Sequence, residues 1–364
     1  MRVAYYSPLP PSRSGIADYS ALLIPALEKR TEVVVAKPGR FRRGPDADVA
    51  LYHVGNDPAE HGWIVEALRR RPGIVVLHEF VLHHLVSGLT LARGDLEGYA
   101  DALERDAGPQ GRKLARAVAD GQIRPLWETR PTDYPLAGEV LGLASGLIVH
   151  SHYVEKRART AGYSGPVWQV SMPAWPVPDV EPAELEGSPL LGAFGHVNES
   201  KRMPQLFEAF DRLRARRPDA RLLVVGAWSP RYADLPVPEG VIRRDYVPED
   251  ELWRLLGACD AVVSLRWPTM GETSAAAIRA LSLGKPLVVS DVGWFSELPG
   301  SVAAKVPVGE GEIEQLERAL EQTATDPEMG KAALELARTE HDLERVADLY
   351  ASVLHEAAEL ERAA

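Results

Sequence analysis

The sequence predicts an α/β protein made of two doubly wound domains, each built on a parallel sheet. Its 364 residues suggest two domains, at about 100–200 residues for each. Short apolar runs alternate with amphipathic stretches almost from end to end, which is typical of parallel strands joined by helical crossovers. The pattern occurs twice, once on each side of a proline-rich segment.

The first half should contain one domain, over residues 1–172. Strands are expected at six apolar runs, namely residues 3–6, 33–36, 49–53, 74–78, 147–150 and 167–170. Amphipathic helices are expected between them, as at 16–29 and 63–71. Residues 87–144 hold no strand candidate and include helical stretches at 95–105 and 110–119. An insertion of this size is either a lid or substrate platform, or simple helical packing on the sheet.

The proline-rich segment at residues 173–189 is expected to link the domains, because proline fixes φ and removes a backbone donor. The second domain should span 190–342, followed by an acidic terminal helix at 343–364. Its strand candidates are residues 190–194, 222–225, 241–243, 261–265, 286–290 and 303–306. Its helices are expected at 203–216, 249–258, 274–283 and 312–323.

Composition excludes several kinds of function. The net charge of −11 argues against nonspecific binding to nucleic acid, which needs a positive surface. A single cysteine, Cys259, excludes an internal disulfide framework and fits a reducing compartment. No apolar run is long enough to span a membrane, and the N-terminus lacks the features of a signal peptide. We therefore expect a soluble, cytoplasmic protein.

Three basic clusters, at 40–43, 69–71 and 214–217, stand out against the acidic background. They are either solvated loops and helix ends or a surface for anionic lipid or a phosphorylated acceptor. Peripheral contact with a membrane is therefore possible without a transmembrane segment.

In parallel sheets, ligands bind where strands lead into helices, so these junctions are the candidate sites. After the strand at 190–194 comes Gly195, then a polar loop in which Asn198 or Ser200 could cap the following helix. Lys201 and Arg202 place cations at that helix start. Exposed amides, helix polarity and a cation together suit a diphosphate.

A second junction follows the strand at 261–265. An irregular loop leads to Glu272, and Thr273 or Ser274 can cap the start of an alanine-rich helix. Glu272 is either a capping carboxylate or an acceptor for the hydroxyls of a bound sugar. Arg266, just after the strand, could meet phosphate or form a salt bridge.

Two junctions in the first half are further candidates. Gly15 follows the first strand and would let backbone approach a ligand. His78 lies at the end of a strand, where active-site residues are expected. A zinc motif fails there, because the histidine that it needs at position 82 is Leu82. His53 and His150, also at strand ends, are lesser candidates, and a structural role is favoured for His53.

The two junctions of the second half resemble the retaining nucleotide-sugar glycosyltransferases of family 4, which have the GT-B fold. In that family a Gly-Arg loop with a later lysine precedes a helix. A glutamate-containing loop then leads to a helix that ends in Ala-x-x-x-Gly-Lys-Pro, followed by a strand and Asp-Val-Gly. This chain has Gly195-His196, Lys201, Glu272, Ala280, Gly284-Lys285-Pro286, Asp291-Val292-Gly293 and Glu297.

The resemblance implies two Rossmann-like domains that face a central cleft. It also implies that Lys201 holds the donor diphosphate and Glu272 the hydroxyls of the transferred sugar. The amides of Thr273 and Ser274 would bind the distal phosphate, and His78 would contact the donor sugar.

The chain departs from the family pattern at two positions. His196 replaces the family's loop arginine, and Arg202 could compensate for the lost charge. Arg279 stands where the family's second glutamate usually holds the nucleotide ribose. A guanidinium only donates hydrogen bonds, so ribose recognition must differ.

We therefore expect transfer of a sugar from a UDP- or GDP-linked donor to an unknown acceptor, which could be a glycan, a lipid-linked molecule or a small molecule. No cofactor is expected besides this co-substrate. No metal is expected, because the Asp-x-Asp triplet at 46–48 precedes a strand instead of following one. A sugar-nucleotide epimerase of the same fold is the alternative. A nicotinamide dehydrogenase is disfavoured because neither half has Gly-x-Gly-x-x-Gly.

Overall fold

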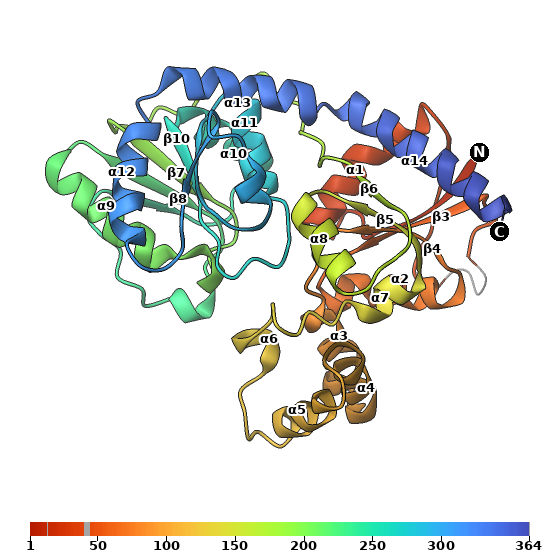
Figure 1. Ribbon diagram of the computed structural model, residues 1–364. Coiled ribbons are helices and arrows are strands. Elements are labelled where there is room, and N and C mark those ends of the chain that lie inside the picture. Colours follow the sequence, from red (N-terminus) through yellow and green to blue (C-terminus); the bar gives the residue numbers. More distant parts are fainter. Residues whose placement is uncertain (13, 40–43, 364) are drawn as a thin grey trace. The chain divides into compact units, whose positions relative to one another are not determined.

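The computed structural model describes residues 1–12, 14–39 and 44–363, which form two compact units (Figure 1). The first unit comprises Met1–Pro173, Met270–Thr273 and Leu343–Ala364, and the second comprises Ala174–Thr269 and Ser274–Asp342. Each unit is built on a six-stranded sheet in which every strand pair is parallel. The predicted α/β class and the two doubly wound sheets are therefore confirmed.

The first unit has the strand order β2-β1-β3-β4-β5-β6. Its strands are β1 (Arg2–Tyr6), β2 (Glu32–Val35), β3 (Val49–Val54), β4 (Gly73–Leu77), β5 (Ala144–Val149) and β6 (Val167–Gln169). Helices α1 (Gly15–Glu28) and α14 (Leu343–Ala363) cover one face of this sheet. The other face is covered by α2 (Pro58–Arg70), α7 (Gly138–Leu143) and α8 (His152–Thr160) (Figure 1).

The predicted helical insertion is confirmed between β4 and β5. It contains α3 (His83–Leu89), η1 (Leu91–Arg93), α4 (Leu96–Ala107), α5 (Gln110–Ala119) and α6 (Leu126–Thr129). These helices have a hydrophobic core of their own, around Tyr99, Leu103 and Ala115. His83 fixes the insertion internally, because its Nδ1–H donates to the Tyr134 carbonyl and its Nε2 accepts the Tyr99 hydroxyl. The insertion is thus a separately packed helical element.

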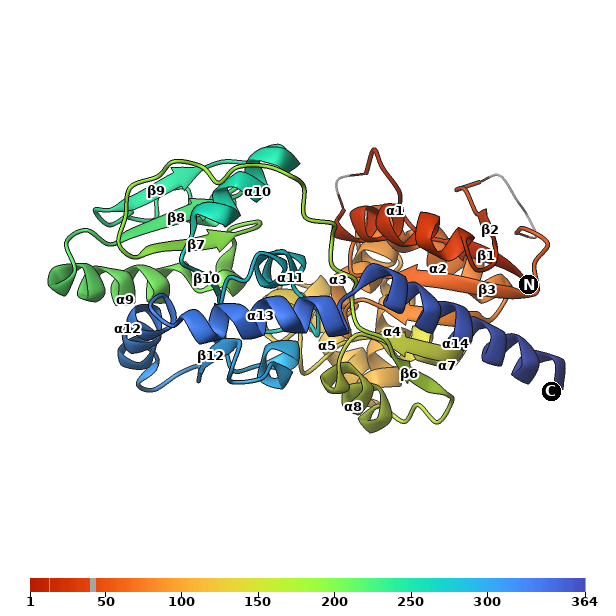
Figure 2. The same ribbon diagram turned by 90° about the horizontal axis from the view of Figure 1, so that it is seen from above.

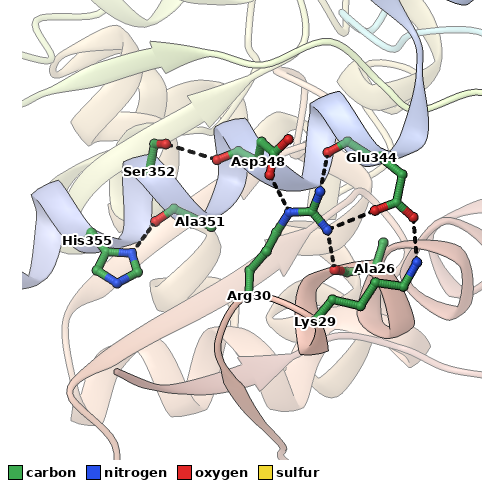
Figure 3. A network of polar contacts seen from close by, with 8 residues as sticks. All are labelled: Ala26, Lys29, Arg30, Glu344, Asp348, Ala351, Ser352 and His355. Atoms are coloured by element: carbon green, nitrogen blue, oxygen red, sulfur yellow. Dashed lines mark hydrogen bonds and ion pairs between the residues drawn. The ribbon is translucent and has the colours of Figure 1, made fainter.

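The C-terminal helix α14 returns to the first unit and packs along α1. Figure 3 shows Arg30 between Glu344 and Asp348, with Nε 2.6 Å from Asp348 Oδ1 and Nη1 3.0 Å from Glu344 Oε2. Lys29 adds a contact of 2.6 Å to Glu344 Oε1. On the buried side, the Tyr19 and Tyr350 hydroxyls share a hydrogen bond of 2.7 Å. The ion pairs and the buried hydrogen bond together hold α14 against α1.

The second unit has the strand order β12-β11-β10-β7-β8-β9 (Figure 2). Its strands are β7 (Leu190–Phe194), β8 (Arg221–Val225), β9 (Val241–Arg244), β10 (Ala261–Ser264), β11 (Leu287–Ser290) and β12 (Ala303–Val306). Helices α9 (Met203–Arg216) and α12 (Glu312–Thr323) cover one face. Helices α10 (Glu249–Ala258), α11 (Ala275–Ser282) and α13 (Pro327–Glu340) cover the other (Figure 1). Short 3-10 turns, η2 (Glu199–Lys201), η3 (Pro230–Tyr232) and η4 (Gly293–Glu297), complete the connections.

Most predicted elements lie where the sequence places them, but two starts are wrong. Strand β5 begins at Ala144, three residues before the predicted position. Helix α2 begins at Pro58, five residues before the predicted position, because Asp57 accepts the amides of Ala59 and Glu60 and caps it. Residues 173–189 contain no helix or strand, as their prolines predict. No helix in the described part of the chain is long and apolar enough to cross a membrane.

Candidate functional site

The strand order of the second unit reverses between β7 and β10. From β7 the chain runs to β8 and β9 on one side, and it then returns to β10 on the other side of β7. Helix α9 follows β7 and α11 follows β10, so both helices begin at the same edge of the sheet. Open parallel sheets bind ligands at such a reversal. The two junctions that the sequence indicated are therefore neighbours.

The junction after β7 holds Lys201 against Gly195. Gly195 has φ of +101°, and a Cβ at this position would lie 3.7 Å from Lys201 Nζ. Asn198 Oδ1 accepts the amide of Ser200 at 3.2 Å and its hydroxyl at 2.7 Å, which fixes the turn η2. Lys201 is only 9% exposed, whereas Gly195 and His196 are exposed. A buried ammonium beside open glycine backbone suits an anionic ligand.

Arg266 joins the ends of three strands at this edge. Its backbone amide donates to Ser290 Oγ at 2.9 Å, and its Nη1 donates to Ser200 Oγ at 3.1 Å. Trp267 also donates its amide to the Ser200 carbonyl at 2.7 Å. Arg266 therefore lies close to the turn that carries Lys201, and the two cations belong to one edge. The sequence indicated Asn198 or Ser200 as the cap of the following helix, which is wrong, because α9 has no side-chain cap and Asn198 caps η2 instead. It gave no signal for Ser290.

The start of α11 has the form expected for an anion site. Ser274 caps it by accepting the amide of Ala277 at 3.3 Å, as the sequence predicted. The Thr273 hydroxyl is buried and has no hydrogen-bond partner among the described residues. The first amides of a helix lack intrahelical partners and carry partial positive charge. This end of α11 can therefore donate several hydrogen bonds to an anion.

Arg202 is already engaged within the protein. Its guanidinium binds both carboxylate oxygens of Glu312, whose side chain is 4% exposed, and Gly309 donates its amide to the same carboxylate at 3.0 Å. The sequence gave no signal for Glu312, which lies 110 positions away. Arg202 thus has its charge paired, and its role at the donor site remains a prediction.

Arg279, at the position of the family's ribose-binding glutamate, is held by aromatic rings. Its guanidinium lies 3.8 Å from the ring centroid of Trp175 and 5.9 Å from that of Trp253. Nη2 donates to Glu249 Oε1 at 3.3 Å. Cations over aromatic faces are attracted by the ring quadrupole. The Arg279 side chain is therefore packed within the second unit, and it holds the Glu249 carboxylate beside its guanidinium.

In the first unit, the segment Met270–Thr273 packs beside the end of β4. The Met270 carbonyl accepts the amides of Phe80 at 2.8 Å and Val81 at 3.0 Å. Gly271 has φ of +91°, and a Cβ there would lie 3.1 Å from the Phe80 nitrogen. Glu272 Oε2 accepts the amide of Met270 at 2.7 Å. His78 and Glu272, from different halves of the sequence, are thus brought into one unit.

His78 belongs to a buried cluster of aromatic side chains. Its Nε2 is 3.0 Å from His53 Nδ1, and its ring centroid is 5.2 Å from that of His150 and 4.9 Å from that of Tyr19. Burial lowers the pKa of His53 and His78 well below the ordinary value, and neighbouring imidazoles lower both further. These rings are therefore neutral at pH 7. The sequence treated His53 as structural and missed its direct bond to His78.

Gly15 lies at the first residue of α1, after the cap Ser14, whose hydroxyl accepts the amide of Ile16 at 3.2 Å. A Cβ on Gly15 would meet no atom of the described residues within 4 Å, so among these residues the backbone is open at this helix start. The structure thus places Gly15 where the sequence predicted.

Two of the three basic clusters are engaged in contacts. Arg69 lies 2.6 Å from Glu139, and Arg71 donates to the Ala47 carbonyl at 2.8 Å. In the cluster at 214–217, Arg214 lies 2.7 Å from Glu239 and Arg216 lies 2.6 Å from Glu317. These contacts favour the structural interpretation of both clusters. The third cluster, at 40–43, lies outside the described residues.

Within the described residues, no three His, Cys, Asp or Glu side chains are arranged to hold a metal ion.

Comparison with known proteins identifies what the second unit resembles. Residues 188–326 match the family model described as Glycosyl transferases group 1. This match confirms, for that part of the chain, the resemblance to glycosyltransferases inferred from the motifs. Assignment to family 4 remains a prediction. No curated protein sequence matches the chain.

Three solved structures share the fold at low sequence identity. Sucrose-phosphate synthase from Thermosynechococcus elongatus has a TM-score of 0.66 at 15% identity, and the alignment covers 100% of both chains. HepE of Anabaena, in complex with UDP and glucose, has a TM-score of 0.64 at 14% identity, covering 98% of this chain and 100% of HepE. WaaG, a glycosyltransferase involved in lipopolysaccharide biosynthesis, has a TM-score of 0.57 at 13% identity, covering 97% and 99%. These likenesses confirm the GT-B fold.

Proposed function

We propose that the chain transfers a sugar from a UDP- or GDP-linked donor to an acceptor. The observation that carries this proposal is the edge between β7 and β10, where Lys201, Arg266 and the starts of α9 and α11 converge. The glycosyltransferase family match over residues 188–326 and the fold shared with UDP-bound HepE support it.

In this proposal the diphosphate binds at that edge. Lys201 supplies charge from a buried position, and the amides at the start of α11 supply hydrogen bonds. Each charge-assisted hydrogen bond contributes about 1.5–3 kcal/mol. Negative charge grows on the departing diphosphate during transfer, so these groups stabilise the transition state more than the bound substrate. No metal is needed for this step.

We propose further that the reaction retains the anomeric configuration. The bond between the anomeric carbon and the diphosphate oxygen breaks, and a bond from that carbon to the acceptor oxygen forms on the same face. The acceptor's proton passes to the leaving diphosphate oxygen. Glu272 accepts hydrogen bonds from the hydroxyls of the transferred sugar, and His78 contacts the same sugar.

Ribose recognition in this chain must use a group other than residue 279. Arg279 offers only donors, and a ribose diol needs an acceptor as well. The Glu249 carboxylate, held 3.3 Å from Arg279 Nη2, is a suitable acceptor nearby. In this proposal Arg279 contributes to donor binding by positioning the Glu249 carboxylate.

The experiment that tests the function incubates the protein with UDP- and GDP-sugars, first alone and then with candidate acceptors. A transferase releases the nucleoside diphosphate and leaves the unreacted donor with its original sugar. A sugar-nucleotide epimerase, the alternative of the same fold, isomerises the donor without an acceptor. Isomerised donor in the first reaction, with no nucleoside diphosphate released in either, would replace our proposal by that alternative.

A further inference from the structure

Three histidines stand at the carboxyl ends of three adjacent strands in the first unit. His53 lies in β3, and His78 and His150 directly follow β4 and β5. Their side chains are buried, with residue exposures of 0%, 8% and 6%. Because neighbouring strand ends meet at one edge, the three rings form a contiguous group at the place where the first unit would meet a ligand.

Hydrogen bonds to carbonyl groups fix the protons on two nearby rings. His150 Nδ1 is 2.7 Å from the Val170 carbonyl, and His61 Nδ1 is 3.1 Å from the His53 carbonyl. A carbonyl only accepts, so both histidines carry their proton on Nδ1. The contact between His53 Nδ1 and His78 Nε2, at 3.0 Å, is different, because either nitrogen could donate.

The other ring nitrogen of His53, Nε2, shows which of the two histidines donates the hydrogen bond in this contact. His53 Nε2 is buried and has no hydrogen-bond partner among the described residues. A neutral imidazole has one N–H and one acceptor nitrogen, and buried N–H groups are almost never left unpaired. The proton of His53 therefore lies on Nδ1 and is donated to His78 Nε2. His78 must then carry its own proton on Nδ1.

We infer that His53 is a positioning residue, which fixes His78 as the Nδ1–H tautomer and makes it a hydrogen-bond donor. The use of this donor toward the sugar rests on the proposed function. Burial keeps both rings neutral, which agrees with the lowered pKa of each. His78 therefore binds an oxygen of the substrate as a neutral donor and does not act as a base.

The surrounding side chains hold both rings in place. Tyr5 stacks on His53 with centroids 4.6 Å apart and an interplanar angle of 28°. The edge contact between Tyr19 and His78 has an angle of 85°. Tyr19 is itself tied to Tyr350 of α14 by a hydroxyl contact of 2.7 Å. These contacts restrain the planes of the two rings, and the hydrogen bond between the rings sets the tautomer.

The tautomer can be measured directly by ¹⁵N NMR on the full chain labelled in histidine, with the His78 signals assigned from a His78→Gln variant. We expect a protonated Nδ1 and an unprotonated Nε2 on His78. His53→Asn should preserve this pattern, because the asparagine amide can donate from nearly the same place as Nδ1. His53→Phe keeps the stacking on Tyr5 but removes the hydrogen-bond donor. The proton of His78 should then no longer be confined to Nδ1.

Activity gives an independent readout. His53→Phe should lower kcat by about tenfold, the loss of one hydrogen bond of about 1.4 kcal/mol, with little change in the donor KM. His53→Asn should restore most of kcat. A protonated Nε2 on His78 in the wild-type chain, or an unchanged tautomer in His53→Phe, overturns the inference. If instead the tautomers are as expected and no sugar is transferred, the proposed function fails while the assignment of His53 stands.

Discussion

Arg202 and Glu312 form a pair in which neither side chain is more than 15% exposed. Removing one partner from a buried pair leaves an uncompensated charge, which costs about 3–5 kcal/mol. We expect Arg202→Ala to lower the free energy of unfolding by about this amount, measured by urea denaturation. The double variant Arg202→Ala/Glu312→Ala should be more stable than Arg202→Ala alone. If the double variant is the less stable of the two, the pair is not what stabilises this site.

The residues of this site differ in how well their positions and their partners could be predicted from the sequence. Lys201 and Ser274 lie in the loops that lead from a strand to the next helix, so local order along the chain was enough to place them at the sheet edge. The donor-binding role of Arg202 and Arg279 stays a prediction, and the sequence did not indicate the partners that these two side chains have in the structure. Glu312 lies about a hundred positions from Arg202 along the chain, and Trp175 lies about as far from Arg279. No local sequence pattern predicts such contacts.

Tyr350 links helix α14 to the buried cluster through the hydroxyl of Tyr19. Both tyrosines are fully buried, so Tyr350→Phe leaves the Tyr19 hydroxyl without this partner. We expect a loss of about 1–3 kcal/mol in the free energy of unfolding, measured by urea denaturation. Ser352→Ala, on the exposed side of α14, is the control and should change stability by less than about 0.5 kcal/mol. Equal effects of the two variants would contradict the linking role of Tyr350.

The apolar periodicity of the sequence predicted whether an element is a helix or a strand better than it predicted the residues at which the element begins and ends. The bounds of α9, α10 and α12 agree with the sequence because apolar spacing and turn residues coincide at both ends. Helix α2 was predicted to start late, because its first turn is set by the cap at Asp57 and not by apolar residues. Helix α8 was not predicted, although Ser151 caps it in the same way.

Four buried histidines of the first unit should make the whole molecule sensitive to acid. The pKa of His61 and of His83 is lowered to about 4 by burial, and burial also lowers the pKa of His53 and His78. Unfolded histidines have a pKa of about 6.5, so below that pH the unfolded chain binds more protons than the folded chain. Stability should therefore fall as the pH drops from about 6.5 toward 4, by up to about 1.4 kcal/mol per pH unit for each histidine.

Urea denaturation at pH 7.5, 6.0 and 5.0 measures this dependence. His61→Asn should have a shallower slope than the wild-type chain between these values. Ser352→Ala replaces an exposed side chain that does not titrate in this range and is the control, which should leave the slope unchanged. A stability that is flat across this range would show that these imidazoles are not neutral in the folded protein.

The sequence did not predict that the first unit is formed by three separate segments of the chain. The proline run contains no helix or strand and lies between the last strand of the first sheet and the first strand of the second. Helix α14 joins the first unit through ion pairs more than 300 positions apart, such as that between Lys29 and Glu344. Contacts of this kind follow from the folded surfaces and not from any local pattern.

The most direct test is a calorimetric titration of UDP and GDP, with the matching monophosphates, into wild-type protein, Lys201→Ala and Lys331→Ala. Lys331 lies exposed on α13 in the same unit and serves as a control for the loss of one positive charge. We expect a diphosphate to bind the wild-type chain more tightly than its monophosphate. Lys201→Ala should weaken that binding by about 10–100-fold, and Lys331→Ala should leave it unchanged. Undiminished diphosphate affinity in Lys201→Ala would contradict the assignment of the β7–β10 edge as the diphosphate site.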